Sequence, residues 1–221
     1  RDGIELSRQT MAGLLMQLAT PLAPIAAALQ AQLRQGRVIH ADETPVQVLG
    51  EPGRDNDQAS YMWVFCGGPP EAPVRWFEYA ASRAASVPAR VLLQGPAQAV
   101  GTDPPMKFYL HSDGYSAYGV VATDPAVIGH AGCWAHVRRK FVEAAGGRHS
   151  GAAQQMLAYI GQLYAVEHRL SQAEPLERHA ARLQHSRPIL DAIQSWLEAT
   201  VTRTPPKGLL GKAVGYALGQ W

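Results

Sequence analysis

The stretch His40-Ala41-Asp42-Glu43-Thr44-Pro45 lies inside an apolar run over residues 38–49. An unpaired carboxylate buried in such a run costs several kcal/mol, so its presence there indicates a specific role. A second acidic residue, Asp113, stands at the end of another apolar run. We therefore expect Asp42 and Asp113 to meet in space and to hold a divalent metal ion.

The composition is that of a packed globular protein. The chain has 221 residues, of which 47% are hydrophobic and 17% are charged, and this excludes a largely disordered chain. The formal net charge is +2, but it is uneven. Residues 1–110 carry 9 Lys/Arg against 10 Asp/Glu, whereas residues 111–221 carry 11 against 8. The excess of positive charge in the second half points to an anionic partner.

Cysteine usage and the chain ends predict a cellular setting. Cys66 and Cys133 do not make a disulfide framework, which favours a reducing cytoplasm. We see no secretory signal and no apolar run of membrane-spanning length, so no membrane partner is expected. The chain begins at Arg1 without Met and ends at Trp221 within a helical pattern, which predicts a fragment of a longer protein.

The first 36 residues are predicted to form two helices, over 5–17 and 22–34, separated at Pro21 and Pro24. Ser7 is the expected cap of the first helix. Ser-Arg-Gln-Thr before an apolar helix is typical of a DNA-reading helix, and a plain packing helix is the alternative.

The middle of the chain predicts a mixed α/β sheet. Runs of β-branched and aromatic residues, joined by polar or Gly/Pro-rich loops, indicate an antiparallel meander of three strands. A helix then allows a crossover to a fourth, parallel strand, and a short helix leads to a fifth. Helices on the sheet faces complete the expected fold. The expected strands are 37–49, 60–66, 74–79, 106–112 and 126–130, and the expected crossover helix is 83–94. After Cys133 the pattern is helical, over 133–145, 152–171, 175–200 and 207–221.

Alternation along a strand decides which side chains can share a metal. Asp42 and Glu43 point to opposite faces, so only Asp42 is expected to face Asp113. Two nearby carboxylates repel each other, and a hard divalent cation such as Mg²⁺ or Mn²⁺ relieves that repulsion. Two such ions can activate an attacking oxygen and stabilise a leaving oxygen at a phosphodiester. In the alternative interpretation both aspartates are turn or strand-end residues, because Asp113-Gly114 is also a turn signal.

A basic block follows the fifth expected strand. Its three cationic side chains are candidates for binding phosphates, and its two aromatic rings are candidates for stacking on a base. These candidate nucleic-acid-binding residues are Trp134, His136, Arg138, Arg139 and Lys140. The alternative is a solvated basic face with Trp134 and Phe141 in the core. Cys133 and His136 also have the spacing of a zinc half-site, but we find no second pair of ligands with suitable spacing.

Three ordered blocks resemble the bacterial insertion-sequence transposases of the sixty-six family. The blocks are His40-Ala-Asp-Glu-Thr-Pro-Val46, Ser112-Asp-Gly-Tyr-Ser-Ala-Tyr118 and Gly132-Cys-Trp-Ala-His-Val-Arg-Arg-Lys-Phe141. Shorter likenesses include Ser82-Arg83 and Leu210-Gly-Lys-Ala213. The resemblance implies a DDE-type catalytic domain with a ribonuclease-H-like fold, in which Asp42 is the first acidic ligand and Asp113 the second.

The third acid of that family stands in an Asn-Asn-x-x-Glu-Arg block, which does not occur in this sequence. We therefore expect it beyond Trp221, with Glu167 and Glu143 as the fallback candidates within the chain. Without a third acid, the fragment is expected to be inactive by itself.

The resemblance also implies a function and a division of the chain. Residues 1–36 are expected to end a DNA-binding or linker region, residues 37–145 to form the ribonuclease-H-like core, and residues 146–221 to form a helical insertion. The implied activity is DNA strand cleavage and strand transfer with two Mg²⁺ or Mn²⁺ ions, in the bacterial cytoplasm. The implied partners are double-stranded DNA, further copies of the chain and helper proteins of the element. The alternatives are a non-catalytic DNA-binding or assembly fragment and a ribonuclease-H-like nuclease unrelated to transposition.

Overall fold

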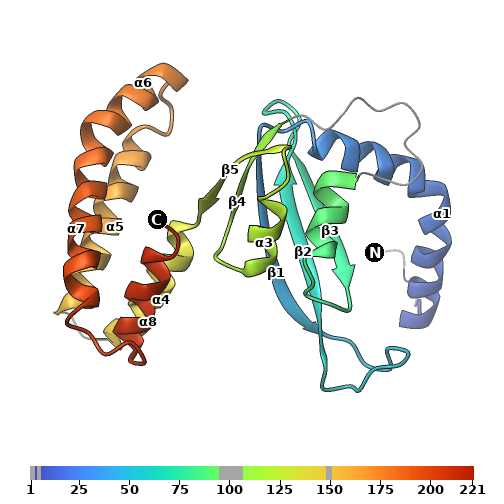
Figure 1. Cartoon of the computed structure of the whole chain (residues 1–221). Helices are drawn as coiled ribbons and strands as arrows, with labels where there is room; N and C mark the ends of the chain where they lie inside the picture. The colour runs from blue at the N-terminus through green and yellow to red at the C-terminus, as the bar shows by residue number, and fades with distance from the viewer. Residues whose placement is uncertain (1–2, 4–5, 95–106, 148–150) are drawn as a thin grey trace. The chain divides into compact units, whose positions relative to one another are not determined.

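The computed structural model describes residues 3, 6–94, 107–147 and 151–221 (Figure 1). These residues form two compact units, Arg1–Ala131 and Gly132–Trp221. The first unit holds the sheet and the second is helical, and each has a hydrophobic core of its own.

Five strands form one mixed sheet in the order β3-β2-β1-β4-β5, which confirms the predicted α/β class. The central strand β1 pairs antiparallel with β2 and parallel with β4, and β2 pairs antiparallel with β3. The strands are β1 (Val38–Gln47), β2 (Ala59–Gly67), β3 (Val74–Ala80), β4 (Phe108–Ser112) and β5 (Val127–Gly132). All five therefore lie close to the ranges expected from the sequence.

Two contacts give the direction of β5. The Phe108 N–H donates to the Ala126 carbonyl at 2.9 Å, and the Ser112 hydroxyl lies 2.7 Å from Nε2 of His130. Both contacts join residues 18 positions apart, as in two strands that run the same way. β4 and β5 are therefore parallel, and the carboxyl end of β1 lies at the same edge of the sheet as theirs.

Alternating burial explains why these segments are strands. Ile39 and Ala41 of β1 are buried, while His40 and Asp42 between and after them are exposed. β2 contributes large aromatic side chains to the same unit's core. Burying such side chains stabilises the fold by about 1.5–3 kcal/mol each. The largest fully buried side chains of this unit are Trp63, Tyr118, Phe65, Phe108, Leu33, Ile39, Leu92 and Leu110.

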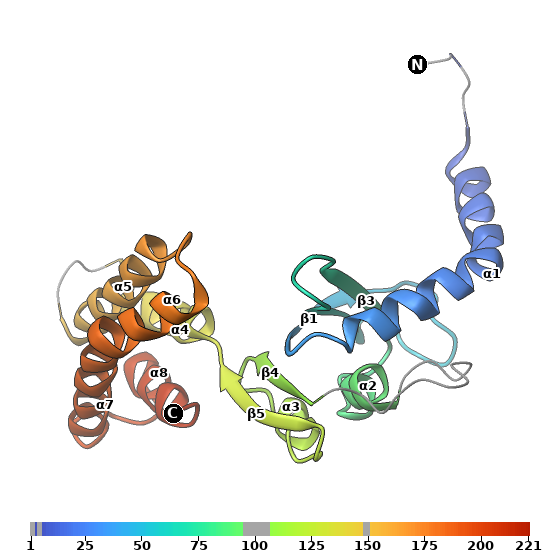
Figure 2. The same ribbon diagram turned by 90° about the horizontal axis from the view of Figure 1, so that it is seen from above.

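The first helix differs from the prediction. α1 is one continuous helix, Arg8–Leu33, that includes Pro21 and Pro24, so the expected pair of helices over 5–17 and 22–34 is wrong. The predicted cap is confirmed, because the Ser7 side chain accepts a hydrogen bond from the Thr10 N–H at 3.1 Å. The helix changes direction part-way along (Figure 2), as expected where prolines remove backbone hydrogen bonds.

As one continuous helix, α1 is long and apolar enough to cross a membrane, judged by its length and composition alone. Its most apolar window has a mean hydropathy of 1.6 and none of that window is buried. The last turn is built into the sheet unit, since Leu33 is fully buried and its carbonyl accepts the Gly68 N–H at 3.0 Å. A side chain at Gly36 would stand 2.5 Å from that same nitrogen, so this close approach requires glycine.

Two short helical segments and α3 complete the sheet unit. The predicted helix 83–94 is shorter than expected, with α2 over Ser86–Ala89 followed by a π-helical segment over Arg90–Gln94. Its predicted end at Gly95-Pro96 lies outside the described residues. The short helix expected after Gly114 is α3, Ser116–Val121.

The second unit is a helical bundle, as the sequence predicts. The expected helix over 175–200 is divided by a π-helical segment at Arg182–Ser186, so it forms two helices. The helices are α4 (Trp134–Ala145), α5 (Ala152–Arg169), α6 (Pro175–Ala181), α7 (Arg187–Val201) and α8 (Leu209–Leu218). α4 packs against both α5 and α8, and α7 packs against α5 and α8. Fully buried core residues are Phe141, Met156, Ile160, Ile193, Leu197 and Val214.

Candidate active site

The two predicted acidic residues lie at neighbouring positions of the sheet. β1 and β4 run parallel, with His40 opposite His111. Asp42 stands two residues after His40 in β1, and Asp113 stands two residues after His111, directly after the end of β4. Asp42 is exposed and Asp113 is half-buried, so a cation from solvent can reach this edge.

Each of these carboxylates is oriented by a backbone N–H. Oδ1 of Asp42 accepts from Glu43 at 2.9 Å, and Oδ1 of Asp113 accepts from Tyr115 at 2.9 Å. Asp113 is therefore also the turn residue that the alternative interpretation expects. Exposed carboxylate oxygens in adjacent parallel segments are a suitable partial ligand set for Mg²⁺ or Mn²⁺. Among the described residues, however, no group of three or more His, Cys, Asp or Glu is placed to hold a metal ion.

A pair of histidines lies beside the aspartates. Nδ1 of His40 is 2.8 Å from Nδ1 of His111, and the two rings meet edge to face with centroids 4.6 Å apart. His130 lies against Ser112 of β4, as described above. These contacts give His111 and His130 each a partner within the sheet.

Glu43 lies on the opposite side of β1 and is held by a buried network. Its side chain is only 1% exposed and forms an ion pair with Arg83. Nε of Arg83 donates at 2.8 Å, Nη2 donates to the same oxygen, and the Tyr118 hydroxyl donates to the other oxygen. The sequence predicts which face Glu43 occupies but not these partners. Arg83 belongs to the short likeness Ser82-Arg83, and Tyr118 ends the block that begins at Ser112. These resemblances to the transposase family are the sequence signal that could have identified both residues.

The hydrogen-bond network around Glu43 changes the pKa of Tyr118. Burial, together with the hydrogen bond to Glu43, raises the pKa of Tyr118 well above its usual value, so the phenol stays protonated and donates. The charges of Asp42 and Asp113 raise the same pKa further. Of the three carboxylates that raise this pKa, Glu43 is the one that accepts a hydrogen bond from the Tyr118 hydroxyl.

Arg83 is the cation that offsets this negative charge. Burial lowers its pKa, but the hydrogen bond and charge of Glu43 outweigh burial, so the pKa of Arg83 is raised. Its guanidinium also lies 3.8 Å from the centre of the Tyr115 ring, and the Tyr115 hydroxyl donates to the Arg83 carbonyl at 2.6 Å. These contacts tie the segment before α2 to the segment after β4.

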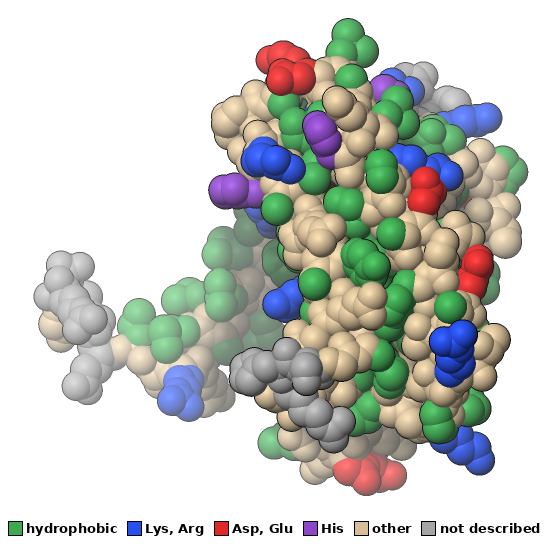
Figure 3. All heavy atoms as spheres, turned by 90° about the vertical axis from the view of Figure 1, so that its left-hand side faces the viewer, with side chains coloured by type: hydrophobic (Ala, Val, Ile, Leu, Met, Phe, Trp, Pro, Cys, Tyr) green, Lys and Arg blue, Asp and Glu red, His purple; other side chains and the backbone are tan. Residues whose placement is uncertain are grey.

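The basic block lies on α4 in the helical unit. Arg138 and Arg139 are exposed, Lys140 lies 4.5 Å from the centre of the Tyr216 ring, and Phe141 is fully buried. Trp134 and His136 are half-buried. The block is thus both a packing face and a cationic face. Figure 3 shows one face of the molecule, on which side chains of both charges are interspersed among hydrophobic ones.

The fallback acids have other surroundings. Glu167 of α5 forms a two-contact ion pair with Arg182, at 2.8 and 2.6 Å. This contact lowers the pKa of Glu167. Glu143 is exposed on α4. Glu167 therefore has a structural explanation that requires no metal.

Three antiparallel strands, a parallel fourth and fifth strand, and acids on β1 and directly after β4 define a ribonuclease-H-like fold of the DDE class. The family model described as "Transposase IS66 family" matches residues 1–221. The chain therefore belongs to the IS66 transposase family, as the three sequence blocks predict.

Curated relatives come from Sinorhizobium fredii (strain NBRC 101917 / NGR234). "Uncharacterized protein y4qI" is 27% identical over 99% of this chain and 40% of its own length. "Uncharacterized protein y4jD" is 25% identical over 99% of this chain and 42% of its own length. The chain thus spans about 40% of the relatives it matches. No solved structure matches the chain.

Proposed function

We propose that this chain supplies two acidic metal ligands, Asp42 and Asp113, to the active site of a DNA transposase. The longer protein would use that site to cleave DNA strands and to join a 3′-hydroxyl to target DNA. The observation that supports this proposal is the register of β1 and β4 in a member of the IS66 family, in which His40 pairs with His111 two residues before each aspartate.

DDE transposases use divalent metal ions, and transposases bind DNA. When bound, Mg²⁺ or Mn²⁺ lowers the pKa of an attacking water or hydroxyl and neutralises charge at the phosphodiester. Asp42 and Asp113 would hold the ions through their carboxylate oxygens. The proposed third acid is a Glu supplied by part of the longer protein that the chain does not cover. Glu167 is the weaker candidate because Arg182 already pairs with it.

Buried residues on the opposite face of β1 stabilise the strand that carries Asp42. Glu43 is the direct neighbour of Asp42, and its contacts with Arg83 and Tyr118 hold β1 from the opposite face. Arg138 and Arg139 of α4, with Lys140 and His136 beside them, are proposed to contact DNA phosphates, and Trp134 to stack on a base. The proposed partners remain double-stranded DNA, further copies of the chain and helper proteins of the element, in a bacterial cytoplasm.

Titration with Mn²⁺, followed by calorimetry, tests the proposed ligands. The double variant Asp42→Asn/Asp113→Asn removes both charges while keeping the side-chain shapes, so we expect Mn²⁺ affinity to fall by about tenfold or more. Asp124→Asn is the matched control, because Asp124 also accepts a backbone N–H in a turn, from Ala126 at 2.8 Å. Equal Mn²⁺ affinity in the native chain and the double variant would contradict a metal site here.

A second experiment separates the alternative functions. The longer protein would be assayed for cleavage of element-end DNA and for joining to a target. Joining that depends on Asp42 and Asp113 supports the transposase. Cleavage without joining supports a nuclease, and binding without either reaction supports a non-catalytic assembly role.

A further inference from the structure

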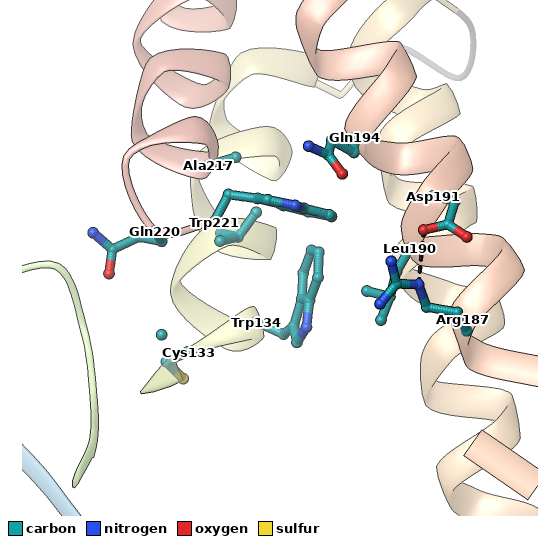
Figure 4. A pocket seen from close by; sticks show the side chains of 11 residues that line it. Cys133, Trp134, Arg187, Leu190, Asp191, Gln194, Ala217, Gln220 and Trp221 are labelled. Atoms are coloured by element: carbon teal, nitrogen blue, oxygen red, sulfur yellow. Dashed lines mark hydrogen bonds and ion pairs between the residues drawn. The ribbon is translucent and has the colours of Figure 1, made fainter. Parts of the chain in front are cut away.

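A hollow of about 300 Å³ opens within the helical unit, between the start of α4, the first turns of α7 and the end of α8 (Figure 4). Its volume lies at the lower end of the range for small-molecule sites, about 300–1,000 Å³. It therefore suits a small planar group better than an extended ligand. It is distinct from the aspartate pair, since all its lining residues belong to the second unit.

Two indoles form the apolar part of this hollow. Trp134 and Trp221 meet edge to face, with ring centroids 6.2 Å apart and an interplanar angle of 87°. Trp134 is half-buried, so its ring is not fully used by the core. A flat aromatic ligand gains about 1–3 kcal/mol from stacking on such a ring.

Polar groups occupy the α7 side. Gln194 projects from α7 toward the Trp221 ring, while Gln220 points away from both indoles (Figure 4). Nε2 of Gln194 donates to Glu198 at 3.2 Å, which orients the amide. Two turns earlier on α7, Arg187 pairs with Asp191 at 2.9 Å at the edge of the hollow. An amide and an ion pair beside a stacking surface are the groups that read the polar edge of a base.

Charged side chains of both signs continue around the Trp134 side. A second hollow, of about 480 Å³, shares Trp134, Arg187 and Leu190 with the first and is also lined by His179 and by the ion pair of Arg182 with Glu167. The exposed Arg138 lies four residues after Trp134 on α4, and so on the same helix face. A stacking surface beside the exposed Arg138 is complementary to a base attached to a phosphate backbone.

We infer that the hollow between Trp134, Trp221 and Gln194 binds one unpaired nucleobase of a DNA strand, with a flanking phosphate toward the exposed Arg138. The inference rests on the proposed function, because it assigns a specific contact to DNA that the chain is proposed to bind. It places the base on which Trp134 is proposed to stack in one hollow, with Gln194 and Trp221 as its further contacts.

The test uses the 221-residue chain and two short duplexes that differ at one unpaired overhanging nucleotide. One overhang carries a fluorescent purine analogue, and the other is abasic but has the same phosphates and a distant dye. We expect the chain to bind the base-bearing DNA about tenfold more tightly and to quench the analogue by stacking. Trp134→Ala should abolish both the preference and the quenching, and Trp134→Phe should keep part of each.

Two further variants keep the test decisive if Trp134→Ala unfolds. Gln194→Phe leaves both indoles in place and fills the hollow, so it should also abolish the preference for a base. Arg139→Ala, the matched control on the same helix, should weaken binding of both duplexes equally. Equal binding of both duplexes by the native chain would overturn the base site and leave DNA binding intact. Failure to bind either duplex would overturn the proposed DNA function together with the site.

Discussion

Replacing Arg83 by Ala is expected to lower the free energy of unfolding of the sheet unit by about 3 kcal/mol. The reason is the position of its partner, because the Glu43 side chain is 1% exposed and cannot regain water when the guanidinium is removed. Tyr118 then remains the neighbouring donor, and one hydrogen bond does not offset a buried charge. β1 would be destabilised at the residue next to Asp42.

Native-state hydrogen exchange on the β1 and β2 amides measures this loss within the sheet unit. Arg90→Ala is the matched control, because Arg90 also pairs with a glutamate, Glu78, at 2.8 Å, but both side chains are more exposed. We expect that control to cost less than about 1 kcal/mol. Equal losses in the two variants would show that burial of Glu43 does not govern the stability of this strand.

The second large effect is expected at Gly211 of α8. A Cβ at this buried position would stand 2.1 Å from the Pro205 carbonyl oxygen and 2.9 Å from Cα of Pro206. These are backbone atoms, so the contact is relieved only by moving α8 or the preceding loop. We expect Gly211→Ala to destabilise the helical unit by about 3 kcal/mol.

Gly215 provides the comparison on the same helix, since a Cβ there meets nothing within 4 Å. Gly215→Ala should stabilise the unit by about 0.5–1 kcal/mol, because alanine loses less backbone entropy in a helix. Hydrogen exchange on the α4 and α8 amides checks both variants. A neutral Gly211→Ala would mean that the loop at 204–208 gives way at little cost.

Much of the sheet could be predicted because its signals are local. Alternation places Ile39 and Ala41 on the buried side of β1 and Asp42 on the other, and the loops between strands carry clear turn residues. The helical crossover before β4 makes a parallel pairing with β1 possible, which the structure confirms. The metal-binding role of the two aspartates stays a prediction.

The remaining features depend on contacts that local patterns do not contain. Proline predicts a helix end, yet α1 continues through Pro21 and Pro24, and no window of sequence reveals that outcome. The partners of Glu43 lie 40 and 75 positions away, so the pairing of the folded segments, rather than any spacing, brings them together. The hollow beside Trp134 likewise requires α4, α7 and α8 to be packed.

The order of the two cores along the chain has a consequence for biosynthesis. Every residue of the sheet-unit core precedes residue 128, and every residue of the helical core follows residue 133. Domains generally fold as units from the N-terminus while translation proceeds. The strands that carry Asp42 and Asp113 can therefore assemble on the ribosome before α8 has been translated, and newly made helices would meet a sheet that is already folded.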